Sequence, residues 1–133
     1  MWLVARFSAA LSIELPGRLA AALGLATAGA VVALAGVAEF RRVRTTVSPL
    51  RPERASALVT SGVFRWTRNP MYLGLALALL GWAALLAHPL AALGVPVFVA
   101  WMSRWQIPRE EHALEALFGE EFARYRTRVR RWL

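Results

Sequence analysis

Charged and hydrogen-bonding side chains gather where one long apolar segment of this chain begins. Arg68 and Asn69 precede the segment, which then opens as Pro70-x-Tyr72-x-Gly74. An arginine can hold a carboxylate through its planar fork, and charged groups at the rim of membrane helices are costly unless they bind something. The pattern therefore favours a binding site for a charged small molecule at a membrane surface.

Two adjacent carboxylates, Glu110 and Glu111, follow the last apolar segment. Each feature alone has a structural explanation, since Asn69 suits a helix N-cap and Pro70 suits the first helical turn. Glutamates are also favoured at a helix start by the helix dipole. The joint spacing of these groups is what favours a site.

The composition indicates a membrane protein of single-domain length, 1–133. Its hydrophobic content of 58% exceeds the roughly 45–50% of soluble domains. With no cysteine, no aspartate and two histidines, little material is left for a metal site or a serine-type triad. The net charge of +8 fits anionic lipid headgroups, and no nucleic-acid motif accompanies it.

Three apolar stretches are predicted to cross the membrane, at about 19–40, 71–87 and 90–105. The last two form a hairpin because the residue before Pro89 is disfavoured in helical conformation, and Pro96 should kink the third stretch. Residues 1–15 are either a short further span or an interfacial helix.

Small residues recur at intervals of four and three in two of these stretches. Such stripes let helices approach closely in lipid, although a generic Ala/Gly-rich membrane segment would explain them equally well. The two stripes are Gly29, Ala33, Gly36 and Gly74, Ala78, Gly81.

Arginine placement sets the expected orientation. Seven arginines lie from Arg41 to Arg68 and seven more from Arg104 to Arg131. Because arginine-rich loops stay in the cytoplasm, the loop 41–70 and the C-terminal tail should meet at one membrane face. The prediction is an integral protein of the bacterial inner membrane with its site on the cytoplasmic side.

The tail has the apolar periodicity of an amphipathic helix over about 109–131. It should lie along the interface, with Gly119 weakening or bending it, and close over the loop 41–70. The predicted fold class is thus all-α: a helical bundle of three to four transmembrane helices with a C-terminal amphipathic interfacial helix.

The paired motif resembles the signature of the isoprenylcysteine carboxyl methyltransferase and phospholipid methyltransferase superfamily, whose members are integral membrane enzymes that use S-adenosylmethionine. Asn69 stands where the isoprenylcysteine enzymes carry histidine. The flanking segments that also fit are Thr45-Thr46-Val47-Ser48-Pro49, Leu58-Val59-Thr60-x-Gly62-x-Phe64-Arg65 and Leu117-Phe118-Gly119-x-x-Phe122-x-x-Tyr125.

The resemblance implies a set of residues that hold the cofactor. Arg68 would pair with the α-carboxylate of S-adenosyl-L-methionine, and Glu110 or Glu111 would accept from its ammonium or ribose. Backbone groups would hold the adenine, with Tyr72 packed beside it. The full set is Val59, Gly62, Arg68, Asn69, Pro70, Tyr72, Gly74, Glu110 and Glu111.

The acceptor implied is lipophilic or membrane-resident, carrying a carboxylate, an amine or a thiol. Glu111 or Tyr125 would take a proton from an amine or thiol, whereas Arg128 or Arg124 would orient a carboxylate. The alternative functions are a non-catalytic membrane scaffold or subunit of this fold and, less favoured, a basic surface module that recruits anionic lipid or nucleic acid. The sequence fixes neither the acceptor nor the oligomeric state.

Overall fold

The computed structural model describes residues 1–7, 14–45 and 55–133, and every regular element in these ranges is helical. Of the segments singled out in the sequence, 8–13 and 46–49 therefore lie outside the described residues. The elements in chain order are α1 (Trp2–Phe7), α2 (Arg18–Val43), the 3-10 helix η3 (Gly62–Arg65), α3 (Pro70–Leu86), α4 (Pro89–Ala92), α5 (Gly94–Trp101), the π-helix η4 (Met102–Gln106) and α6 (Ile107–Arg128).

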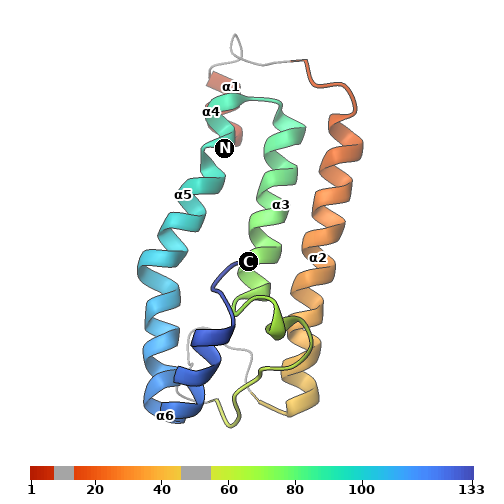
Figure 1. The fold of residues 1–133 in the computed structure, drawn as a ribbon. Coiled ribbons are helices and arrows are strands. Elements are labelled where there is room, and N and C mark those ends of the chain that lie inside the picture. Colours follow the sequence, from red (N-terminus) through yellow and green to blue (C-terminus); the bar gives the residue numbers. More distant parts are fainter. Residues whose placement is uncertain (8–13, 46–54) are drawn as a thin grey trace.

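Helices α2 and α3 run antiparallel as the tightest pair of the bundle (Figure 1). The two predicted stripes of small residues form their contact. A Cβ added to Gly74 would overlap the backbone oxygen of Gly29 and come within 2.8 Å of the Ala33 Cβ. The interpretation of the stripes as close packing is confirmed, because only glycine lets these two backbones touch.

Gly74→Ala is expected to lower the free energy of unfolding by about 1–3 kcal/mol, since the added methyl group must push the two helices apart. Gly24→Ala is the matched control, because an added Cβ there meets nothing within 4 Å and alanine is the better helix former. The midpoint of thermal unfolding in one detergent measures both. A Gly74 variant as stable as its Gly24 counterpart would contradict this packing.

The predicted hairpin at His88-Pro89 is present. Helix α3 ends at Ala87, whose φ of 48° is left-handed, and the imidazole Nδ1 of His88 accepts from the Ala91 backbone N–H at 3.4 Å. Pro96, predicted to kink the third stretch, cannot donate to the carbonyl of residue 92. The helix is interrupted there, between α4 and α5, although Leu93 keeps right-handed helical angles.

The predicted tail helix of 109–131 needs correction at both ends and in its middle. No break separates it from the apolar stretch, because η4 continues directly into α6, with the Ile107 backbone N–H donating to the Met102 carbonyl. Gly119, at φ 49° and ψ −121°, reverses the chain, a conformation open only to glycine. The second half of α6 therefore returns towards the bundle (Figure 1) and ends at Arg128.

Two helices are long and apolar enough to cross a membrane: α2, and the nearly continuous run from Pro89 to Arg128. Helix α3, at 17 residues, is a shorter apolar helix at the lower end of the roughly 17–25 residues that a crossing needs. The outer faces are apolar, as lipid requires, with Leu34, Leu75 and Val97 all more than half exposed. The described residues thus form an all-helical fold with two candidate membrane-spanning helices, and the predicted count of three to four stays a prediction.

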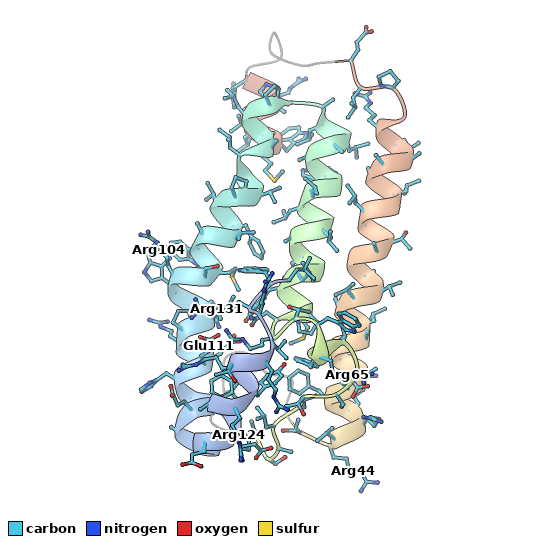
Figure 2. All side chains as sticks on the ribbon, viewed as in Figure 1. Arg44, Arg65, Arg104, Glu111, Arg124 and Arg131 are labelled. Carbon is cyan, nitrogen blue, oxygen red and sulfur yellow. The ribbon has the colours of Figure 1, made fainter. Side chains whose placement is uncertain are left out.

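One end of the bundle collects the arginine-rich segments. Helix α2 ends and helix α3 begins there, and both halves of α6 lie beside them, so that Arg44, Arg65 and Arg124 come close to one level (Figure 2). The predicted meeting of the loop 41–70 with the tail at one face is confirmed for the described part of that loop. This end also carries the main pocket.

Candidate functional site

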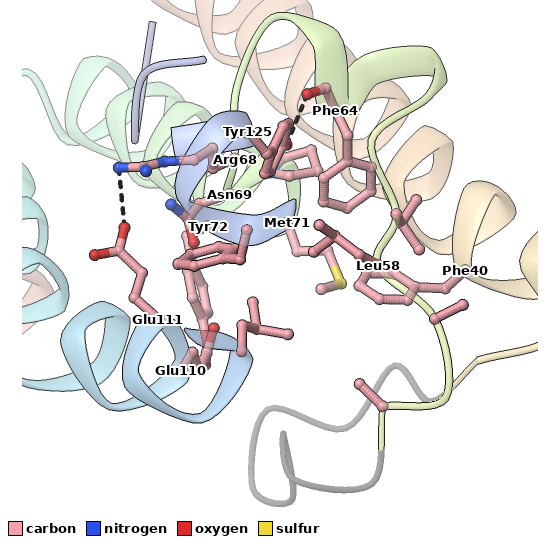
Figure 3. Close-up of a pocket in the computed structure, with 16 residues that line it drawn as sticks. Phe40, Leu58, Phe64, Arg68, Asn69, Met71, Tyr72, Glu110, Glu111 and Tyr125 are labelled. Carbon is pink, nitrogen blue, oxygen red and sulfur yellow. Dashed lines mark hydrogen bonds and ion pairs between the residues drawn. The ribbon is translucent and has the colours of Figure 1, made fainter. Parts of the chain in front are cut away.

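The pocket lies between the start of α3, the end of α2, the loop before η3 and both halves of α6 (Figure 3). It contains about 670 Å³ of empty space, counting its open mouth. Small-molecule sites commonly measure about 300–1,000 Å³. Its walls differ in character, one being apolar and the other charged, so it suits a ligand with an apolar body and a charged end.

The apolar wall is a small core built from α2, the loop and the second half of α6. Phe40 and Phe64 stack edge to face with ring centroids 5.3 Å apart, and Phe122 is buried beneath them. The Tyr125 hydroxyl donates to the Phe64 carbonyl at 2.7 Å. Because Gly119 reverses α6, these aromatic residues reach the loop that carries Val59 instead of lying along an interface.

A carboxylate on α2 fixes that loop in place. Ser61 donates its hydroxyl to Glu39 Oε2 at 2.5 Å, and Arg42 reaches both the serine oxygen and the same carboxylate oxygen. Gly62 makes this possible, because a Cβ there would lie 2.5 Å from Glu39 Oε1 and its φ of 57° is left-handed. Gly62 therefore positions the loop from outside the pocket.

The charged wall centres on Arg68, whose side chain is only 10% exposed. Its Nη2 lies 3.0 Å from Glu111 Oε1, while its Nε and Nη1 are buried with no hydrogen-bond partner. Burial lowers the pKa of Arg68, the Glu111 carboxylate opposes that shift, and Arg131 adds to it. A buried guanidinium with two idle donors is energetically costly and chemically suited to an incoming anion.

Arg131 joins this wall from the C-terminal tail, and sequence reasoning did not include it in the site. Its Nε donates to Glu111 Oε1 at 3.0 Å and its Nη2 to Oε2 at 2.6 Å. These hydrogen bonds raise the pKa of Arg131. Nothing in the sequence separates it from the other arginines of the tail, because its position depends on the chain reversal at Gly119.

Glu110 forms a separate hydrogen-bonded group in the same pocket. Its Oε1 accepts from the Tyr72 hydroxyl and from Gln106 Nε2, the latter at 2.8 Å. Gln106 belongs to η4 and was also missed in the sequence. Tyr72 is thereby tied to α6, so the two motifs predicted to converge do meet.

Asn69 occupies the N-cap position of α3, as expected, but its side chain does not cap the helix. Its Nδ2 donates instead to the Arg131 carbonyl at 3.0 Å, and its backbone N–H bonds the Thr67 hydroxyl. The tail carbonyl competes successfully with the helix end. Pro70 stands at the first helical position as predicted.

Most of the predicted site residues lie together and three do not. Gly62 and Gly74 contact α2, and Arg128 lines a different depression together with Thr60 and Arg65. Tyr125 lines both hollows. Those around the main pocket are Val59, Arg68, Asn69, Pro70, Tyr72, Glu110, Glu111 and Tyr125.

Comparison with known proteins gives consistent matches. A protein of Haemophilus influenzae described as "Uncharacterized protein" is 51% identical over 63 residues, which is 47% of this chain and all of that protein. Protein-S-isoprenylcysteine O-methyltransferase B of Arabidopsis thaliana is 34% identical over 64% of this chain and 43% of its own length. The human protein-S-isoprenylcysteine O-methyltransferase is 36% identical over 54% of this chain and 25% of its own.

This chain thus spans less than half of the two named relatives. The family model for phospholipid methyltransferases matches residues 17–121, a stretch that includes α2, α3 and the first half of α6, and hence both facing motifs of the pocket. Together with the apolar helices, these matches identify a membrane protein. By its sequence, the chain belongs to the phospholipid methyltransferase family.

Proposed function

We propose that this protein transfers a methyl group from S-adenosylmethionine to a lipophilic, membrane-resident acceptor, with the cofactor site at the cytoplasmic end of the bundle. The observation that carries the proposal is the buried Arg68 fork with two unpartnered nitrogens at the charged wall of a largely apolar pocket. The names of the family and of the relatives support the reaction class.

The residues present fit this cofactor. Arg68 Nε and Nη1 offer a carboxylate two parallel donors, and the Glu111 and Glu110 carboxylates can accept from an ammonium or a hydroxyl group. The apolar wall of Phe40, Leu58 and Phe64 offers a flat ring system a place to pack. When bound, S-adenosylmethionine supplies an electrophilic methyl group.

The pocket favours an acceptor that needs no proton removal. Glu111 accepts from two guanidinium groups and is therefore a weak base, while the Tyr125 hydroxyl is committed to the Phe64 carbonyl. Methyl transfer to a carboxylate forms one C–O bond and breaks one C–S bond without moving a proton. The chain's contribution would then be alignment of the reactants and exclusion of water.

Arg128 is proposed to orient the acceptor's carboxylate. It lines the depression on the other side of Tyr125 together with Arg65, so two cationic side chains lie within reach of an anion there. Tyr125 stands between this depression and the main pocket. In this arrangement Tyr125 would contact both reactants and set their separation.

Calorimetric titration of the purified protein in detergent tests the cofactor assignment. S-adenosylhomocysteine is expected to bind with micromolar affinity, and adenosine, which lacks the charged end, more weakly. A folded protein that binds neither compound would favour the non-catalytic scaffold.

A labelling experiment tests the acceptor class. Host membranes incubated with the protein and methyl-labelled S-adenosylmethionine should yield a lipid-phase label that mild alkali releases as methanol, the behaviour of a methyl ester. An alkali-stable label would instead indicate an amine or thiol acceptor and contradict the carboxylate assignment.

A further inference from the structure

The C-terminal tail docks directly on the segment that carries Arg68. The Arg68 backbone N–H donates to the Arg130 carbonyl at 2.9 Å, and Thr67 Oγ1 and Asn69 Nδ2 donate to the Arg131 carbonyl at 3.1 and 3.0 Å. Residues 130–132, hereafter the tail strap, therefore bond all three residues before Pro70.

The tail strap is also anchored to the third leg of the bundle. Trp132 Nε1 donates to Ser103 Oγ at 2.9 Å, and Arg131 Nη1 reaches the Ser103 carbonyl at 3.4 Å. Ser103 lies in the π-helix η4. The Arg131 guanidinium is thus fixed between α3 and η4, facing Glu111 (Figure 2).

The division of Glu111 between two arginines is unequal. Arg131 binds both of its oxygens through Nε and Nη2, whereas Arg68 reaches only Oε1 through Nη2. A carboxylate prefers a guanidinium in the two-pronged arrangement. Without Arg131, Glu111 would be free to turn and occupy the fork of Arg68, which is the group with idle donors.

We propose that Arg131 is a positioning residue that sets ligand specificity: by holding Glu111 through both oxygens, it keeps the Arg68 fork open for the carboxylate of the bound ligand. The inference rests on the proposed function, since the ligand in question is the methyl donor. Arg131 touches Glu111 and the strap's partners and does not line the pocket, so its effect on the ligand passes through Glu111 and Arg68.

The test compares two ligands that differ by one group, S-adenosylhomocysteine and its decarboxylated analogue. The ratio of their dissociation constants measures carboxylate selectivity. The wild-type protein should prefer the carboxylate form by more than tenfold. Arg131→Ala and Arg131→Gln should reduce that preference to less than threefold, chiefly by weakening S-adenosylhomocysteine binding, and Arg131→Lys should restore it only in part.

Arg130→Ala is the matched control, because that side chain is exposed and its backbone carbonyl, which accepts from Arg68, is unchanged. It should keep the wild-type selectivity. Thermal unfolding of each variant identifies the folded ones, and Arg131→Gln, which preserves chain length and packing, serves if the alanine variant does not fold. Selectivity that survives in a folded Arg131 variant would overturn this inference alone. A wild-type protein that binds neither ligand would overturn the proposed function as well.

Discussion

Glu111→Ala is expected to lower the free energy of unfolding by about 3–5 kcal/mol, because removing one partner of a buried ion pair leaves the other charge uncompensated. Glu111 has 11% of its side chain exposed and neutralises both Arg68 and Arg131. Its loss would also free the tail strap from one of its anchors. The midpoint of thermal unfolding in detergent should fall by many degrees.

The matched control for this prediction is Glu115→Ala on the same helix. Glu115 pairs with Arg126 at 3.6 Å, but both side chains are nearly half exposed, and solvent-exposed pairs contribute little. That variant should unfold within a few degrees of the wild type. Equal stability of the two variants would show that the charged wall contributes nothing to the fold.

Arg68→Ala should weaken S-adenosylhomocysteine binding by more than tenfold, which corresponds to at least about 1.4 kcal/mol. The reason is that its two idle nitrogens are the donors offered to the ligand's carboxylate. Arg68→Lys should bind almost as poorly, since a point charge cannot replace a fork. Titration calorimetry measures both.

The same substitution should disturb the fold less than the loss of Glu111 does. Arg68 is buried with unmet hydrogen bonds, and Glu111 keeps its two bonds to Arg131 when Arg68 is removed. A residue that costs stability and contributes binding is characteristic of a functional site. Arg109→Ala, at an exposed position on α6, is the control and should bind as the wild type does. Undiminished binding by Arg68→Ala would remove Arg68 from the cofactor site.

The sequence was most informative where short-range chemistry decides the structure. Pro89 marked the hairpin and Pro70 the start of α3, because proline restricts its own and the preceding backbone. The small-residue stripes gave the α2–α3 contact. The pairing of Arg68 with Glu111 followed from the expectation that both motifs lie at one membrane face.

The parts that could not be predicted depend on a single backbone conformation. A bend at Gly119 was foreseen, but its φ of 49° and ψ of −121° determine that the tail returns to the pocket, and no pattern of side chains encodes those angles. Arg131 and Asn69 meet only because of that return. Gly74 was assigned to the cofactor and Arg128 to the same site for a related reason: a motif gives spacing along a helix, and the direction each residue faces depends on its neighbours in space.

The π-helix η4 closes its backbone hydrogen bonds five residues apart, one more than an α-helix does. A single residue removed from 102–106 would convert it to an ordinary turn and rotate everything downstream by about 100° about the helix axis. Both carboxylates of the pocket lie just beyond it, so their angular phase relative to α3 is set by that one surplus residue. Insertions and deletions of one residue should therefore be tolerated above η4, where lipid surrounds the helix on most sides, far better than within it.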